Sequence, residues 1–281
     1  MKTTPVRRFD KLLEFTLENR VLVRCLKTLG IGVSSSLCCQ QSCNGSPIMT
    51  LSTSSDIPSA FPLVVVPDTS VWTVGSVHDD DIEGFMPTPE TCLAILTSLK
   101  KQHLLDVFFL SLCFSFNACR KCSMWSTWQI QQVLQVPMDH TEDSTTAEFL
   151  RSLSQHNLTP PLDIFRLMLN YTLFHSFRLS KDGMCVQRDG PILAVIPMVD
   201  VAVTEGINKG NLTLQRSTAE GTRTLLKKNS LLYVKQGLQR RSSDATYWVL
   251  QTARCVKKGE RLTFQPPLKF FFKNDIASSV L

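Results

Sequence analysis

The stretch YWVLQTARCVKKGERLTF, residues 247–264, decides how the chain is expected to fold. Residues 247–253 mix aromatic, β-branched and small side chains in near-alternation, which is typical of a half-buried strand. Residues 254–260 are polar, and Gly259 can take the positive φ that a tight turn needs. Residues 262–264 predict a second short strand, which ends at Pro266 because proline cannot donate to a sheet ladder. The stretch therefore predicts a β-hairpin with a basic turn.

The same residues also carry a longer sequence pattern. Residues 250–262 read L-x-x-A-R-x-V-K-K-G-E-x-L, which resembles the last block of SET-domain protein methyltransferases, especially the branch that includes the plant Rubisco large-subunit lysine methyltransferase. The resemblance implies an α+β class: a SET-like fold of small β-sheets with a mainly helical insertion. It also implies that the family's C-terminal substrate-binding helical domain is absent, since only 14 residues follow Pro267.

Predicted elements elsewhere in the chain agree with this resemblance. Residues 6–29 have apolar side chains at helical spacing and predict an amphipathic helix. Residues 61–67 form an apolar run bounded by prolines and predict a strand. Residues 89–136 and 162–174 predict helices. Because these elements follow the order of the family, we expect the resemblance to extend over most of the chain.

Composition suggests where the chain divides. Residues 34–60 are rich in Ser, Thr, Cys and Gln and predict an irregular or extended insertion, while the polar residues 138–161 predict a linker. The expected parts are the N-terminal helix with the first part of the SET-like domain (1–85), the helical insertion and linker (86–161), the second part of the SET-like domain (162–267) and a C-terminal tail (268–281).

The resemblance assigns chemistry to positions that depart here from the family pattern. In the family, glycines let the backbone approach S-adenosylmethionine, an arginine holds the cofactor's carboxylate, an Asn-His pair anchors the cofactor, and a tyrosine lies against the transferred methyl group. The matching cofactor-binding positions in this chain are Gly30, Gly32, His175, Val203 and Thr204, and the tyrosine position holds Pro266. Histidine is a weaker and pH-dependent carboxylate partner, and proline has neither hydroxyl nor N–H. No catalytic residue is therefore intact, although His175 also fits an ordinary residue at a helix end.

Charge is unevenly distributed along the chain. The net charge of +6 divides into −4 for residues 1–150, with 11 Lys and Arg against 15 Asp and Glu, and +10 for residues 151–281, with 19 against 9. Such a basic half favours RNA or an acidic protein as partner, and the lack of a long apolar run argues against a membrane. A solvated basic loop explains the same composition. The expected partner or RNA-binding residues are Arg223, Lys227, Lys228, Arg240 and Arg241.

Ten cysteines, several within apolar runs, favour free thiols in a reducing intracellular compartment. Cys119 and Cys122 form a lone CxxC, and since a tetrahedral zinc site needs two more ligands, we expect no metal. The acidic residues in the predicted first helix argue against a secretory leader. A mitochondrial location remains a competing interpretation because Arg7, Arg8 and Lys11 are basic. The compartment stays open between mitochondrial and cytoplasmic or nuclear.

Three functions are compatible with these observations. The first is a SET-fold protein without catalytic activity, which needs no cofactor and acts as a scaffold or binding subunit of a larger assembly, such as a ribonucleoprotein or the mitochondrial ribosome. The second is an active S-adenosylmethionine-dependent protein-lysine N-methyltransferase with an altered site. The third is an unrelated α+β binding domain.

Overall fold

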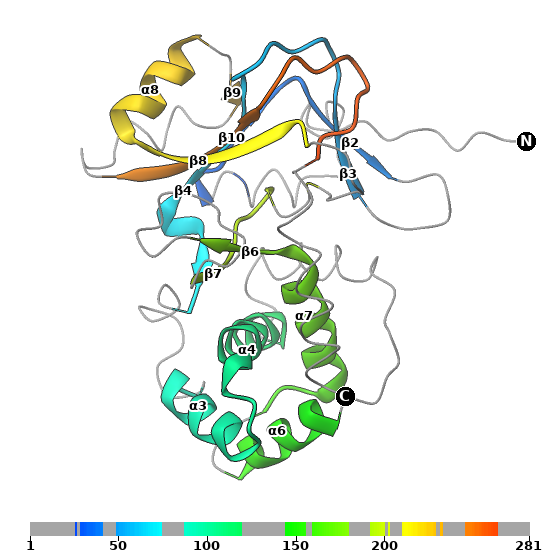
Figure 1. The fold of residues 1–281 in the computed structure, drawn as a ribbon, viewed down its shortest axis with the longest axis vertical. Helices are drawn as coiled ribbons and strands as arrows, with labels where there is room; N and C mark the ends of the chain where they lie inside the picture. The colour runs from blue at the N-terminus through cyan, green and yellow to red at the C-terminus, as the bar shows by residue number, and fades with distance from the viewer. Residues whose placement is uncertain are drawn as a thin grey trace, which may run out of the picture. The chain divides into compact units, whose positions relative to one another are not determined.

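The computed structural model describes residues 26, 29–41, 49–74, 87–119, 144–155, 159–179, 192–199, 202, 210–228, 231–232 and 245–263. The chain divides into two compact units, which are described separately (Figure 1). The sheet unit holds the described residues up to Val71, those at 177–179 and those from Ile196 onward. The helical unit holds the described residues of 72–176 and 192–195. The predicted helix at 6–29 lies almost entirely outside the described residues.

An antiparallel five-stranded sheet forms the centre of the sheet unit, in the order β8-β10-β4-β1-β9. Strand β10 pairs on both sides, so that Trp248 lies opposite Val66 of β4 and Arg216 of β8. All six residues of β4 are buried, which explains its unbroken apolar sequence. The strands predicted at 61–67 and 247–253 are confirmed as β4 and β10. The strands are β1 (Gly32–Ser34), β4 (Pro62–Pro67), β8 (Leu212–Thr218), β9 (Leu231–Leu232) and β10 (Thr246–Thr252).

Two further strands occupy the segment expected to be irregular or extended. Strand β2 (Leu37–Gln41) pairs antiparallel with β3 (Met49–Thr53), from Leu37 opposite Thr53 to Gln41 opposite Met49. The short 3₁₀ turn η2 (Asp68–Ser70) follows β4. The insertion therefore contributes a second small sheet to the sheet unit.

The helical unit contains four described α-helices. Helix α3 begins with Pro89 in its first turn, and the hydroxyl of Thr88 caps it by accepting from the N–H of Thr91 at 3.3 Å. The helices predicted at 89–136, as far as Cys119, and at 162–174 are confirmed. The elements are β5 (Trp72–Thr73), α3 (Pro89–Ser98), η3 (Gln102–Leu104), α4 (Leu105–Cys119), α6 (Ser144–Ser154), α7 (Leu162–His175) and β7 (Ile192–Val195). Strand β6 (Ser176–Leu179) directly follows α7, and its residues 177–179 belong to the sheet unit.

Aromatic rings fill the core around α4. Phe108 contacts Phe149 of α6 edge-on, with 5.0 Å between ring centroids, and contacts Phe165 of α7 at 5.7 Å. A buried polar contact joins α4 to α7, since the hydroxyls of Ser111 and Thr172 lie 3.1 Å apart. This α4-centred core makes the helical unit a separate packed body.

Helix α6 corrects the prediction of a polar linker at 138–161. Its sequence STTAEFLRSLS is polar overall, yet its buried residues recur at helical spacing. Thr145, Phe149 and Leu153 follow one another at intervals of four and face the core with Thr146 and Leu150. Overall composition hid this amphipathic pattern. Among the described helices, none is long and apolar enough to span a membrane.

Candidate functional site

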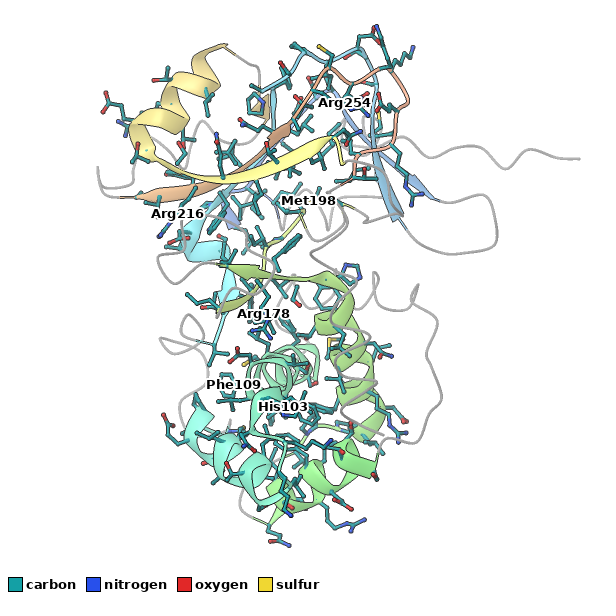
Figure 2. All side chains as sticks on the ribbon, in the orientation of Figure 1. His103, Phe109, Arg178, Met198, Arg216 and Arg254 are labelled. Carbon is teal, nitrogen blue, oxygen red and sulfur yellow. The ribbon has the colours of Figure 1, made fainter. Side chains whose placement is uncertain are left out.

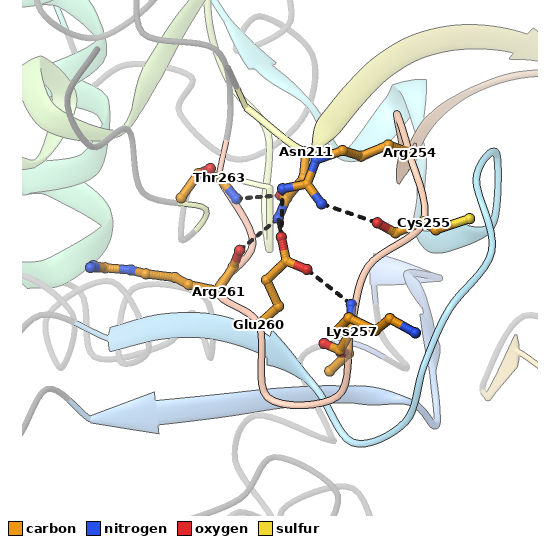
Figure 3. A network of polar contacts seen from close by, with 8 residues as sticks. Asn211, Arg254, Cys255, Lys257, Glu260, Arg261 and Thr263 are labelled. Atoms are coloured by element: carbon orange, nitrogen blue, oxygen red, sulfur yellow. Dashed lines mark hydrogen bonds and ion pairs between the residues drawn. The ribbon is translucent and has the colours of Figure 1, made fainter. Parts of the chain in front are cut away.

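The turn after β10 is held by the carboxylate of Glu260 (Figure 3). Its Oε1 accepts from Nη2 of Arg254 at 2.5 Å and from Nδ2 of Asn211 at 3.2 Å, and its Oε2 accepts from the N–H of Lys257 at 2.9 Å. Partial burial raises the pKa of Glu260, but these three donors outweigh it and hold the pKa below the ordinary value of 4.5. Glu260 is therefore a charged residue that fixes the turn.

Asn211, just before β8, joins this turn to the segment that follows it (Figure 3). Its Nδ2 also donates to the carbonyl of Arg261 at 2.7 Å, and its Oδ1 accepts from the N–H of Thr263 at 2.9 Å. The side chain is almost fully buried, with 2% of the residue exposed. The sequence pattern did not predict this junction.

The segment 261–263 corrects the prediction of a β-hairpin. Strand β10 pairs with β4 and β8, and not with the described residues 262 and 263 of the predicted second strand. Instead Arg261 forms an antiparallel bridge with Ser52 of β3, and the N–H of Leu262 donates to the carbonyl of Leu51 at 2.7 Å. The physical reason is that both sides of β10 are already occupied.

The predicted role of Gly259 is confirmed. Its φ is 78°, in the left-handed region that glycine adopts without strain. Its N–H donates to the carbonyl of Thr53 at 2.8 Å, so the conformation aims the turn at β3. A side chain at this position would meet no atom within 4 Å, and backbone conformation alone therefore favours glycine.

An exposed acid completes the turn from the opposite side. The carboxylate of Asp56 accepts from Nζ of Lys257 at 2.8 Å and from the N–H of Lys258 at 2.9 Å. Two hydrogen bonds lower the pKa of Asp56 below 3.8: the larger contribution comes from the Lys257 side chain and the next from the Lys258 backbone N–H. The same contact raises the pKa of Lys257 above 10.5. The basic turn is thus partly neutralised by residues that the sequence pattern did not connect to it.

The predicted cofactor positions are only partly described. Gly30 has a φ of 67°, and Gly32 begins β1 opposite Val65. Between them the N–H of Ile31 donates to the carbonyl of Leu26 at 2.8 Å, so this amide is not available to a ligand. Val203, Thr204 and Pro266 lie outside the described residues, and their predicted roles stay predictions.

His175 is the last residue of α7. Its ring stacks on that of Tyr171, one helical turn earlier, with 4.7 Å between centroids and 24° between ring planes. This packing suits the alternative of an ordinary helix-end histidine. A role for His175 at a cofactor carboxylate is untested.

The predicted basic residues are divided between helix α8 and undescribed segments. Arg223 is exposed on α8 (Ala219–Lys228), and Lys227 and Lys228 are the last residues of that helix. Arg240 and Arg241 lie outside the described residues. Three of the five basic residues predicted to bind a partner therefore lie on helix α8.

Arg216, another cation of this basic half, has a structural partner. Its Nη2 lies 2.6 Å from Oδ2 of Asp68, whose Oδ1 accepts from the indole N–H of Trp248 at 2.8 Å (Figure 2). Asp68 also accepts from the hydroxyl of Thr246 at 3.2 Å. The carboxylate therefore binds the end of β4 to β8 and β10. No pattern in the sequence indicates this junction, apart from the position of Asp68 directly after a predicted strand.

The CxxC residues show no metal site in the described part of the chain. Cys119 is the last residue of α4, and Cys122 lies outside the described residues. Among the described residues, no three His, Cys, Asp or Glu side chains gather in a way that could hold a metal ion.

Small antiparallel sheets together with a mainly helical segment between β5 and β6 define the class of the protein: it has a SET-like fold. Among solved structures, the chain is similar to the SET domain of LSMT bound to lysine and AdoHcy, with a TM-score of 0.50 and 14% sequence identity. The match covers 89% of this chain and 54% of that chain, so this chain spans about half the length of the other. No protein-family model and no curated protein matches the sequence. At this identity, the likeness concerns the fold.

Proposed function

We propose that this protein is a SET-fold binding subunit that does not transfer methyl groups. The proposal rests on one contrast within the block after β10. Its turn residues Glu260 and Gly259 are kept in contacts that stabilise the fold, whereas the position that the resemblance assigns to the catalytic tyrosine holds Pro266. Proline can neither donate a hydrogen bond nor lie as a hydroxyl against a methyl group. The block is therefore suited to structure and not to catalysis.

The described residues at the predicted cofactor positions fit S-adenosylmethionine poorly. When bound, this cofactor supplies an electrophilic methyl group on a sulfonium. The N–H of Ile31 is already hydrogen-bonded to Leu26, and His175 stands where the resemblance places an arginine, which is a stronger partner for a carboxylate than histidine. We therefore derive no methyl-transfer step for this chain.

The expected partner of this subunit is anionic. Residues 151–281 carry a net charge of +10, and Arg223, Lys227 and Lys228 lie on the same helix. Long-range attraction from such a surface favours RNA or an acidic protein. We propose membership of a ribonucleoprotein assembly, in mitochondria or in the cytoplasm or nucleus, with the mitochondrial ribosome as one candidate.

Anisotropy of a fluorescein-labelled single-stranded RNA tests the binding role. We expect K227E/K228E to weaken binding at low salt, and we expect the wild-type affinity to fall steeply as salt is added, because counterions are released on binding. The matched control K100E/R151E makes the same change in net charge on the helical unit and should weaken binding less. Equal losses in both variants, or a salt-independent affinity, would exclude this RNA-binding role.

One observation favours a second function, an active protein-lysine N-methyltransferase with an altered site. The similar solved structure is a SET domain bound to lysine and AdoHcy. Isothermal titration with S-adenosylmethionine separates the two functions. The non-catalytic role predicts no saturable heat, whereas saturable binding followed by methylation of a protein lysine would establish the second function.

A further inference from the structure

Helix α8 lies against the sheet unit (Figure 1), and few of its side chains at 219–225 are both apolar and buried. It begins where β8 ends and packs on β8 and β10. Of the residues from 219 to 225, only Ala219 and Thr222 are buried, and Leu225 is partly buried. On the helix side, the alanine, the threonine and the part of the leucine buried at 219–225 remove little apolar surface from water, so these residues add little free energy to the packing.

Two hydroxyls, one on the helix and one on the sheet, are buried without a hydrogen-bond partner in the described part of the chain. Thr222 is 0% exposed and Tyr247 of β10 is 2% exposed. Neither Oγ1 of Thr222 nor the Tyr247 hydroxyl has a hydrogen-bond partner among the described residues. A buried polar group without a partner carries the full cost of its lost hydration. The packed position of α8 is therefore opposed by both groups, and each regains hydration if the helix moves away.

Helix α8 is attached to the sheet at both ends, through β8 before it and β9 after it. The hydroxyl of Thr218, the last residue of β8, caps the helix by accepting from the N–H of Gly221 at 3.2 Å. Strand β8 stays paired with β10 along its whole length, from Leu212 to Thr218. After the helix, Leu231 and Leu232 of β9 pair with Ser34 and Val33 of β1. A pivot near residue 218 therefore keeps every β8–β10 pair and breaks at most these two β9–β1 pairs.

We propose that α8 is a displaceable cover on the β8–β10 face of the sheet. It leaves this face much more often than the sheet unfolds, and its departure exposes an apolar strip formed by Val65, Tyr247 and Val249, which pack together beneath it. This proposal does not depend on the binding role proposed above.

Hydrogen–deuterium exchange of the full chain, resolved by mass spectrometry, tests the proposal. We expect the opening equilibrium constant for amides of α8 to exceed that for amides of β10 by about 100-fold or more, because local opening is far less costly than global unfolding. T222V replaces the unpartnered hydroxyl with a methyl group of similar volume. It should lower the opening constant of α8 by about 5- to 30-fold and leave exchange in β10 unchanged.

T224V is the matched control, because it makes the same substitution on the exposed side of the same helix. The hydroxyl of Thr224 donates to the carbonyl of Glu220 at 3.1 Å and is not buried. Y247F removes the second hydroxyl, on the sheet side, and like T222V it should lower the opening constant of α8. Exchange of α8 as slow as that of β10 would overturn the proposal. The proposal would also be overturned if T222V and T224V changed the opening constant of α8 equally and Y247F did not lower it.

Discussion

The side-chain amide of Asn211 lies 3.2 Å from Oε1 of Glu260, across 49 positions of the sequence. Asn211 also binds the backbone of Arg261 and Thr263, so one short side chain holds the segment after the turn against the start of β8. The turn is therefore anchored from outside by a residue that directly precedes another strand. Its strength should be measurable as a loss of stability when the anchor is removed.

N211A should lower the free energy of unfolding by about 1–3 kcal/mol, because it leaves the N–H of Thr263 and the carbonyl of Arg261 without a partner. Urea denaturation followed by tryptophan fluorescence measures the change. Q215A is the control, since Gln215 on the neighbouring strand makes only an exposed contact with Gln251 and should change stability by less than about 0.5 kcal/mol. Equal losses in both variants would contradict the anchoring role.

Stability should fall at acid pH through Glu260. A carboxylate with a lowered pKa stabilises the folded state at pH values above its unfolded pKa, and this contribution is lost as pH falls through the folded pKa. Since the pKa of Glu260 lies below 4.5, the loss should occur below that pH. E260Q should be less stable than wild type at pH 7, and the difference should shrink at pH 3. A constant difference between the two urea midpoints would refute the linkage.

G259A should cost about 1–2 kcal/mol because an L-residue is strained at a φ of 78°. No neighbouring atom stands in the way of the new methyl group, so the whole effect comes from the backbone. G259N is the matched comparison, because asparagine tolerates this conformation better than alanine. Thermal unfolding should rank wild type first, then G259N, then G259A.

The pair of Asp68 and Arg216 should show energetic coupling in a double-mutant cycle. Both side chains are partly exposed, at 36% and 25%, so solvent weakens the ion pair. We expect a coupling of about 0.5–1 kcal/mol from D68A, R216A and the double variant. D68N removes the charge of the ion pair, whereas W248F removes the indole hydrogen bond, so comparing the two variants separates these contributions. Additive losses in the first cycle would show that the two side chains act independently.

Cysteine reactivity should differ between buried and exposed thiols. Burial, followed by the nearby Glu90, raises the pKa of Cys92 to about 12, and burial raises the pKa of Cys113 well above 9.0. Cys255 is exposed on the turn after β10. Because the thiolate is the reactive form, iodoacetamide should label Cys255 in the folded protein and reach Cys92 and Cys113 only in urea. Peptide mass spectrometry at increasing times measures the order.

The sequence predicted those elements whose signal is local. Strand β4 is an apolar run between prolines, α3 begins at Pro89, and Gly259 marks a turn by its conformational freedom. Helix α6 was missed because average polarity conceals an apolar stripe at intervals of four residues. The SET-like fold could be inferred because these local signals occur in the order that the family shows.

Partners distant in sequence could not be predicted in the same way. Residues 262–264 were predicted to form the second strand of a hairpin. Instead Leu262 donates to Leu51 of β3, and Thr263 accepts from Asn211 and Leu212, because β4 and β8 already occupy both sides of β10. The roles of Asp68 and Asp56 depend on Arg216 and Lys257, which lie 148 and 201 positions away. Charge alone does not show which pairs will form when many cations are available.

The pairing of β4 with β10 has a consequence during synthesis. The strand partners are separated by about 185 residues, so β4 leaves the ribosome roughly 10–40 s before β10 exists, at about 5–20 residues per second. Throughout that interval residues 63–66 of β4 lack β10, the strand that pairs with them in the folded protein. The residues of the helical unit are almost all made in the meantime, and their contacts are closer in sequence. We therefore expect the nascent chain to acquire its helices first and to depend on chaperones until residue 252 has emerged.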